Sequence, residues 1–456
     1  MNWSESACSS ALGGITSGSM PAAFSRENLA GELEAKTNRV TDKHYLELWN
    51  TCRMSKTENW QDRDVELDIE KVAHGGIFVA RHEGRVVFVS HTAPMEKVRA
   101  KVFEDKGGSF CRAETIEVLR ASDKRVPHIW KEADRLGAGG AEFGHLALEY
   151  QRQLKTDVLE ESLSRMAGID QRVQVMPVPG DDLTNGLGYR TRVQLHVSEE
   201  GVAGPYRERT HTVVPVKSLP LAVAEINELG VHLKNWQDVK RIEISTASTG
   251  GIQWFIDKKI KGDKRLTERA LGRSFRISSG GFWQVHRGAA ELLASEVVEL
   301  SEGLEIEANN LDLYGGVGLF SGAIATKYGK KLNITTVESS KVATSDASAN
   351  LVDLAKHKAV AAPVDGFLRL QIKQGLELTG ATVILDPPRA GAGKQVVDQL
   401  SFLKPKKVIY VACDPVSLAR DLKTFTASGY RVKTIRAFDL FPHTHHFETV
   451  ASLVLE

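Results

Sequence analysis

Strand-like and helix-like segments alternate through the C-terminal part of the chain, and this alternation constrains the fold more than any other feature. After Gly281, short apolar runs recur, and helical segments lie between them. The runs are NNLDLY, NITTVES, TVILD, KKVIYVAC, RVKTIRAFDL and TVASLVLE. Strands that alternate with helices form a largely parallel sheet with helices on both faces. We therefore predict a doubly wound, Rossmann-like α/β domain over residues 281–456.

The first of these strands ends in a glycine-rich turn that opens a helix, with the sequence LDLYGGVGLF over residues 311–320. A nucleotide-like ligand can approach the backbone closely at such a turn. Counted from Gly316, however, Ser321 stands where a dinucleotide fingerprint requires its last glycine. Glu338 ends the next strand, where a carboxylate can accept hydrogen bonds from both ribose hydroxyls. The pattern favours S-adenosylmethionine, which lacks a pyrophosphate, over a nicotinamide dinucleotide or a purely structural fold.

Two unusual segments follow later strands of the predicted sheet. Asp386 begins the segment DPPR after TVIL, and Cys413 follows KKVIYVA. Ligands of parallel sheets lie beyond the carboxyl ends of the strands, so both segments are expected to face the glycine turn. Asp414 suits a helix N-cap with Pro415 at the first helical position. The helix dipole and a nearby cation such as Arg420 would lower the pKa of the cysteine, whereas the adjacent carboxylate opposes this.

The final strand is expected to bring a carboxylate towards Cys413. If TVASLVLE closes a hairpin and runs antiparallel to the other strands, its beginning lies at their carboxyl edge, and Glu448 approaches Cys413. A base then meets a nucleophile. The alternatives are a buried structural cysteine and a solvated loop carboxylate. Nearby His443, His445 and His446 suggest a metal cluster but lack companion ligands, so no metal site is predicted.

The residues before this domain divide into three regions. Residues 1–60 are expected to be a weakly ordered tail. Residues 61–122 carry five short alternating runs broken by glycine and proline, typical of a small OB-like β-barrel that binds single-stranded nucleic acid or mediates protein contacts. Residues 123–280 are predicted to form a mixed α+β middle domain that starts with a helical stretch around Phe143–Ala167. Its arginines beside tyrosines are candidates for RNA contacts or for a solvated strand face.

Composition excludes several classes of protein. The 59 lysines and arginines nearly balance 58 acidic residues, so RNA binding would depend on local basic clusters. No CxxC pair or zinc-ligand spacing occurs among the four cysteines, which indicates a reducing cytoplasm rather than a disulfide framework. The chain lacks an apolar run long enough to span a membrane and lacks a signal peptide. These features predict a cytoplasmic protein without membrane association.

Four motifs, DLYGGVGLF, DPPRAG, VACDPVSLARDL and DLFPHTHHFETVASL, occur in this order and resemble the RNA 5-methyluridine methyltransferase family, which acts on transfer and ribosomal RNA. The upstream stretch AHGGIFVARHEGRVVFV looks like the TRAM domain that many members carry as an RNA-binding module. The resemblance covers about residues 60–456. It implies that residues 123–280 recognise RNA and that residues 281–456 bind S-adenosylmethionine.

The resemblance also implies a reaction. A methyl group would pass from S-adenosylmethionine to carbon 5 of a uridine in ribosomal or transfer RNA through a covalent cysteine adduct. Cys413 would be the nucleophile and Glu448 the base. The residues expected to line the cofactor and base pocket are Gln284, Tyr314, Glu338 and Asp386. A single-stranded loop is the expected substrate because the target base must leave its stack. No obligate protein partner is evident.

The chain departs from the family pattern at several positions. Asp414 stands where members often have asparagine, Leu319 where a polar residue is common, and Pro388 where alanine is common. Some relatives hold an iron–sulfur cluster with four cysteines after the barrel. Because no cysteine lies between Cys111 and Cys413, no cluster is expected.

Two other functions remain open from the sequence. An amino-group methyltransferase would hold its base with an NPPY-like motif, whereas this chain has DPPR without an aromatic residue and would not need Cys413. A TRAM-containing RNA-binding protein that has lost catalytic activity is the second alternative. The presence of both Cys413 and Glu448 argues against such a loss.

Overall fold

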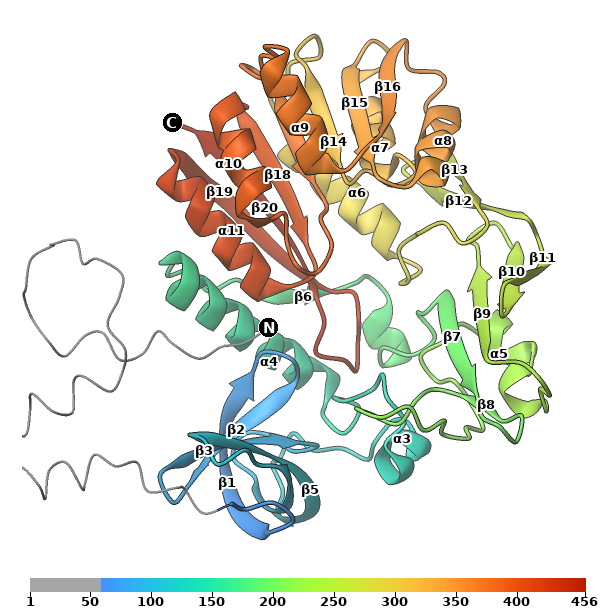
Figure 1. The fold of residues 1–456 in the computed structure, drawn as a ribbon, viewed down its shortest axis with the longest axis vertical. Coiled ribbons are helices and arrows are strands. Elements are labelled where there is room, and N and C mark those ends of the chain that lie inside the picture. The colour runs from blue at the N-terminus through green and yellow to red at the C-terminus, as the bar shows by residue number, and fades with distance from the viewer. Residues whose placement is uncertain (1–58) are drawn as a thin grey trace, which may run out of the picture. The chain divides into compact units, whose positions relative to one another are not determined.

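The computed structural model describes residues 59–456, which form one structural unit. The prediction of a weakly ordered tail over residues 1–60 therefore falls outside the described residues, apart from Asn59 and Trp60. Among the helices of residues 59–456, none is both long and apolar enough to cross a membrane. Figure 1 shows the arrangement of the elements.

A closed five-stranded barrel opens the described chain, as the alternating pattern predicts. Its strands pair in the order β1-β2-β3-β5-β4. They are β1 (Asp64–Ala73), β2 (Ile77–His82), β3 (Arg85–Ser90), β4 (Lys97–Glu104) and β5 (Phe110–Arg120). Alternate side chains of β1, including Val65 and Leu67, are buried inside the barrel because successive residues of a strand face opposite sides. The β1–β2 turn contains Gly75 and Gly76, both with positive φ angles.

The middle region has the mixed α+β content that the sequence predicts. Five strands form one sheet in the order β11-β10-β9-β7-β8, and β12 and β13 form a separate hairpin. Its strands are β7 (Arg192–Val197), β8 (Ala203–Gly204), β9 (Arg241–Thr246), β10 (Ile252–Ile256), β11 (Lys259–Gly262), β12 (Arg265–Ala270) and β13 (Arg273–Ser278). The helices are α3 (Lys131–Leu136), α4 (Leu148–Ser162), which continues as a π-helical turn over Leu163–Ala167, and α5 (Ala224–Glu228).

An eight-stranded sheet forms the C-terminal part, in the order β16-β15-β14-β17-β18-β20-β19-β6. The strands are β6 (Val175–Pro177), β14 (Asn310–Leu313), β15 (Asn333–Glu338), β16 (Lys356–Ala361), β17 (Thr382–Leu385), β18 (Lys407–Ala412), β19 (Tyr430–Asp439) and β20 (Glu448–Leu455). Strands β14 to β18 run parallel, and β20 pairs antiparallel with both β18 and β19.

Helices cover both faces of this sheet, which confirms the doubly wound fold (Figure 1). One apolar core contains side chains of α9 (Val364–Lys373), α10 (Gly393–Leu403) and α11 (Pro415–Ala427). The other contains side chains of α6 (Ala289–Leu300), α7 (Leu319–Tyr328) and α8 (Lys341–Asn350). Because both faces are covered, every residue of β14 and β17 is buried, including the polar Asn310 and Asp312 of β14.

The structure adds two strands that the sequence pattern did not reveal. Strand β16 lies at the edge of the sheet, and its sequence KHKAVA is half polar because an edge strand is only partly covered. Strand β6 comes from the middle region and pairs parallel with β19. The region before residue 281 therefore contributes directly to the C-terminal sheet.

Helix α4 connects the barrel to the C-terminal sheet through a buried ion pair. Leu154 belongs to the apolar core of the barrel, whereas the neighbouring Lys155 contacts the end of β19. The Lys155 Nζ donates to Asp439 Oδ1 at 2.5 Å and to the Phe441 carbonyl at 3.1 Å. Both charged side chains are only 1% exposed. Burial lowers the pKa of Lys155, and the Asp439 carboxylate opposes that shift.

Replacement of Asp439 by asparagine should destabilise the fold, because it leaves the buried Lys155 ammonium without its counter-charge. We expect Asp439→Asn to lower the free energy of unfolding by about 3 kcal/mol, and the double variant Lys155→Met/Asp439→Leu to lose less. Thermal unfolding followed by circular dichroism measures both. The control is Asp398→Asn, which breaks an exposed pair with Lys394 and should cost less than about 0.5 kcal/mol. An equal loss in the two single variants would contradict the buried-pair argument.

Candidate active site

The glycine turn after β14 is shaped for close backbone approach. A Cβ atom on Gly315 would lie 2.5 Å from Thr336 Cγ2, so only glycine fits against the neighbouring strand. Gly316 has a φ of +53° and has open space where its side chain would point. The Gly316 N–H donates to Glu338 Oε2 at 3.3 Å, while Glu338 Oε1 accepts from the Ser340 N–H at 2.7 Å. The structure thus places the predicted turn and the predicted acid side by side.

Tyr314 stands between the end of β14 and this turn in an unusual conformation. Its φ of 62° lies in the left-handed region, which a bulky residue rarely adopts and which occurs preferentially at functional sites. Burial, together with the carboxylates of Asp365 and Asp421, raises the pKa of Tyr314 to about 12. Tyr314 and Asp365 line a pocket of about 480 Å³, a volume in the range of small-molecule sites, roughly 300–1,000 Å³.

Sequence reasoning missed Asp365 as a pocket residue. It follows the carboxyl end of β16, and ligands of parallel sheets bind at that edge. The signal was present in the sequence, but it could not be read because the half-polar strand β16 was not recognised.

Two carboxylates, the buried Asp312 and the partly exposed Asp386, lie within or directly after neighbouring central strands. Asp312 is inside β14, where its Oδ2 accepts from the backbone N–H and the hydroxyl of Ser321. Burial raises the pKa of Asp312 to about 6 despite these bonds. Asp386 follows β17, and burial together with the Asp312 charge raises its pKa to about 7. Asp312 was missed from the sequence, although an acidic residue inside an apolar strand is a recognisable signal.

Cys413 and Glu448 meet at this edge, as the antiparallel arrangement predicts. Ala412 of β18 pairs with Thr449 of β20, so the next residues in this register are Cys413 and Glu448. Glu448 also pairs with Phe438 of β19. Its side chain is buried, and burial together with the Asp386 charge raises the pKa of Glu448 well above its ordinary value, although Arg389 opposes the shift.

The surroundings of Cys413 favour the thiol over the thiolate. Burial, followed by the charges of Glu448 and Asp386, raises the pKa of Cys413 to about 12. The opposing cation is Arg389, which sequence reasoning did not assign to the site. The expected role of Arg420 is wrong: its guanidinium instead donates to Asp421 and to the Ala390 carbonyl.

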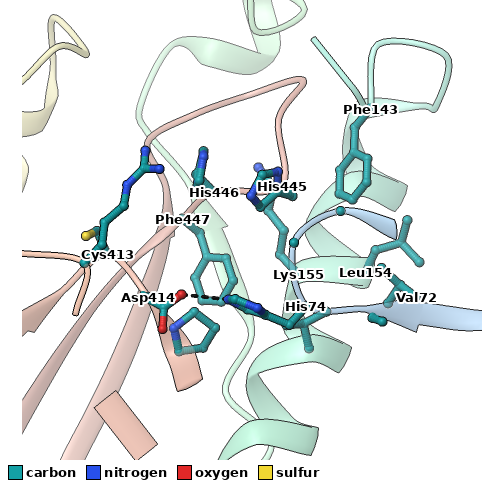
Figure 2. Close-up of a pocket in the computed structure, with 16 residues that line it drawn as sticks. Val72, His74, Phe143, Leu154, Lys155, Cys413, Asp414, His445, His446 and Phe447 are labelled. Carbon is teal, nitrogen blue, oxygen red and sulfur yellow. Dashed lines mark hydrogen bonds and ion pairs between the residues drawn. The ribbon is translucent and has the colours of Figure 1, made fainter. Parts of the chain in front are cut away.

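Asp414 forms the predicted N-cap of α11. Its Oδ1 accepts from the Ser417 N–H at 2.8 Å, and Pro415 occupies the first helical turn. The other oxygen, Oδ2, accepts from His74 Nε2 of the barrel at 2.7 Å, as the dashed line in Figure 2 shows. This contact was not foreseen, because nothing local in the sequence links the β1–β2 turn to α11.

A pocket of about 250 Å³ lies beside Cys413 and Asp414. Its walls come from the barrel turn, from α4 and from the loop before β20 (Figure 2). Labelled lining residues include His74, Leu154, Lys155, His445, His446 and Phe447. Cys413 therefore lines a space enclosed by segments that are far apart in the sequence.

The three histidines of the loop before β20 do not act as one group. His443 is buried, and its ring contacts Gln151 Nε2 and the Asn185 carbonyl. Glu142, a companion that sequence reasoning lacked, is hydrogen-bonded to His445, and His446 lies close enough for the three to form a group of metal-ligand type. The absence of a metal remains a prediction.

Gln284 lies on the segment between β13 and α6, with a side chain that is 8% exposed. Its assignment to the pocket remains a prediction. The other five predicted residues all lie at one edge of the sheet. Tyr314, Asp386 and Cys413 follow the adjacent parallel strands β14, β17 and β18, Glu448 begins β20, and Glu338 ends β15.

Comparison with known proteins gives matches over both ends of the described chain. A family model described as tRNA (uracil-5-)-methyltransferase matches residues 257–455, and the TRAM domain matches residues 63–114. An uncharacterized RNA methyltransferase of Streptomyces avermitilis is 39% identical over 440 residues, which cover 86% of this chain and 98% of that protein. A second, of Bifidobacterium longum, is 35% identical and covers 85% of this chain and 96% of that protein.

Among solved structures, the tRNA (uracil-54, C5)-methyltransferase of Pyrococcus abyssi, in complex with S-adenosyl-L-homocysteine, matches with a TM-score of 0.65 and 23% identity. The match covers 86% of this chain and all of that one, and at this identity it shows a shared fold. The two family models and the two long sequence matches, with the barrel and the sheet in the same order, show the family. The chain belongs to the TRAM-containing tRNA (uracil-5-)-methyltransferase family of RNA methyltransferases.

Proposed function

We propose that this enzyme transfers a methyl group from S-adenosylmethionine to carbon 5 of a uridine in a transfer or ribosomal RNA loop, with Cys413 as nucleophile and Glu448 as base. The observation that carries the proposal is the register of β18 and β20, which places a thiol and a buried carboxylate side by side. An amino-group methyltransferase would not need the thiol. Membership of the uracil-5 family supports the same choice.

The residues at the glycine turn fit S-adenosylmethionine. Gly315 permits close packing against β15, Gly316 leaves space for a ligand, and Glu338 presents two carboxylate oxygens for the ribose hydroxyls. Burial and neighbouring carboxylates raise the pKa values of Asp386 and Glu448, so a cation beside them would stabilise their ionised forms. The sulfonium group of the cofactor is a cation and supplies an electrophilic methyl group.

Cys413 and Glu448 would act in turn on the uracil ring. Addition of the Cys413 thiolate to carbon 6 forms an S–C bond and moves the electrons of the carbon 5–carbon 6 double bond towards the carbonyl at carbon 4. Carbon 5 of the resulting enolate then takes the methyl group. Ionised Glu448 removes the remaining proton from carbon 5, the ring double bond forms again, and Cys413 leaves as a thiolate. One covalent protein–RNA intermediate follows from this sequence.

The electrostatics of the free enzyme fit a site that is activated only when it is filled. In the chain alone, burial and neighbouring carboxylates hold Cys413 as the thiol. A cation near these groups would lower the pKa of both Cys413 and Glu448, because it stabilises their ionised forms. In the free chain, Arg389 in the loop after β17 lowers both pKa values only in part, so a bound cation would lower them further. Thiolate formation would then accompany ligand binding.

Substitutions of Cys413 and Glu448 test the proposed roles. With tritiated S-adenosylmethionine and total RNA lacking modification, wild type should give labelled 5-methyluridine after digestion to nucleosides. We expect Cys413→Ala to lower the rate by about 10³-fold or more. Glu448→Gln should instead accumulate a protein–RNA adduct that resists denaturing electrophoresis, because release of Cys413 is blocked, and the double variant should form none. Label in an amino-methylated nucleoside would support the amino-group alternative and overturn the proposal.

Charge variants near Cys413 test the electrostatic argument without RNA or cofactor. The rate of Cys413 alkylation by iodoacetamide, read from the mass of its peptide, follows the thiolate fraction. We expect Asp386→Asn to raise this rate by about three- to tenfold at pH 8, because it removes a charge that raises the pKa of the thiol. Arg389→Gln is the matched variant of opposite sign and should lower the rate. Shifts in the same direction would contradict the charge assignment.

Glu338→Gln tests the cofactor site by itself. A neutral amide cannot accept from two ribose hydroxyls as a carboxylate does, so the dissociation constant for S-adenosylmethionine should rise by about tenfold or more. Isothermal titration calorimetry measures this constant, and RNA affinity in the same variant should stay unchanged. Glu307→Gln, which breaks an exposed contact with Lys356, is the control. If Glu338→Gln bound the cofactor as wild type does, the ribose contact would be ruled out.

A further inference from the structure

The β1–β2 turn of the barrel packs against both segments that carry the proposed catalytic pair. His74 Nε2 donates to Asp414 Oδ2 at 2.7 Å, directly beside Cys413. Two residues further, a Cβ atom on Gly76 would lie 2.8 Å from the Cβ of His445, in the loop that leads to Glu448. Figure 2 shows His74 reaching Asp414 at the side of the pocket that also contains Cys413.

Asp414 places a third carboxyl group near Cys413. After burial, Glu448 and Asp386 oppose the Cys413 thiolate most strongly, and Asp414 adds to their effect, whereas Arg389 favours the thiolate. The other basic groups at this pocket face different partners. Lys155 is bound to Asp439, and His445 is bound to Glu142. The ring of His446 lies tilted against that of His445, and burial lowers the pKa of His446. His74 is therefore the basic group of the pocket that pairs with Asp414.

We propose that His74 is a positioning residue for the reaction at Cys413: its imidazolium holds Asp414 as the cap of α11 and offsets the carboxylate charge, so that docking of the barrel favours the Cys413 thiolate. This inference rests on the proposed function. The role goes beyond the binding of RNA by the barrel, because it makes the state of the nucleophile depend on a residue of another domain.

The direction of the pH effect follows from the pair. The hydrogen bond to Asp414 raises the pKa of His74 above its ordinary value, so the imidazolium persists below that raised pKa and is lost as the pH rises through it. Burial pushes the pKa of Asp414 upward, but the bonds from His74 and the Ser417 N–H outweigh it, and the carboxylate stays ionised. The contribution of His74 to the thiolate should therefore be present in mildly acidic solution and vanish in alkaline solution.

A double-mutant cycle on the full chain separates this role from simple docking. His74→Gln keeps a hydrogen-bond donor and removes the charge, while Asp414→Asn keeps a good N-cap and removes the carboxylate. We expect His74→Gln to slow iodoacetamide alkylation of Cys413 by about three- to tenfold near pH 6.5. A rise of one unit in the pKa of the thiol corresponds to about tenfold. Near pH 9 the variant should react at the wild-type rate. Asp414→Asn should react faster than wild type.

The double variant decides the question. If His74 acts through Asp414, His74→Gln should change the alkylation rate less than about twofold in the Asp414→Asn background. An equal slowing in both backgrounds, or wild-type alkylation by His74→Gln at every pH, would overturn the inference. Arg81→Gln, at an exposed position on the same barrel, is the control and should react like wild type.

The methylation assay keeps the two proposals distinguishable. The alkylation cycle needs neither RNA nor cofactor. If the wild-type enzyme formed no 5-methyluridine, the proposed function would be wrong, but the alkylation rates would still test the role of His74. If the enzyme is active, His74→Gln should lower kcat near pH 6.5 by about the same three- to tenfold as it slows alkylation. The RNA dissociation constant should stay within about twofold of wild type. Loss of RNA affinity with an unchanged alkylation profile would assign His74 to binding instead and overturn the positioning role.

Discussion

The antiparallel strand β20 is the constraint on which the rest of the site depends. A purely parallel sheet would bring only strand ends to its ligand-binding edge, whereas β20 begins there and lies between β18 and β19. The register then fixes Glu448 beside Cys413 to within one residue, because a slip by one would turn the side chain to the other face of the sheet. The position of the carboxylate is thus determined by backbone hydrogen bonds and by the apolar residues of β20, and not by a flexible loop.

Burial disfavours the ionised forms of the acidic groups that this register brings together. Asp312, Asp386 and Glu448 all have raised pKa values, and burial, followed by the charges of Glu448 and Asp386, favours the neutral Cys413 thiol. A group of buried acids with few cations costs stability in the free protein. Such an arrangement is retained at sites whose ligand supplies the missing charge. The strained φ of Tyr314 at the same edge points the same way, since backbone strain concentrates where a ligand is held.

Local sequence patterns were sufficient for the elements but not for the contacts between them. Alternation in β1 to β5 predicted the barrel, and the glycine turn with Glu338 predicted a ligand edge, because both signals lie within short stretches of chain. Strand β16 was missed because its edge position leaves it half polar. Asp365, which follows this strand, was therefore not recognised as a pocket residue. Arg420 lies seven residues after Cys413 and Arg389 lies 24 residues before it, so proximity in the sequence favoured Arg420, and only the folded loops show that Arg389 is the cation that acts on Cys413. His74 had no local signal at all.

The contact between His74 and Asp414 also links the barrel to the C-terminal sheet at the pocket. Separate apolar cores fill the barrel and each face of the sheet, and α4 contributes to two of them, with Leu154 in the barrel core and Leu159 in a core of the sheet. Near the pocket, two polar contacts join the same parts: the pair His74–Asp414 and, through α4, the pair Lys155–Asp439. Polar contacts contribute geometry and charge more than cohesion. An RNA that altered the seating of the barrel would therefore change the charge beside Cys413 while leaving both cores intact, so substrate capture and nucleophile activation would be coupled without any refolding.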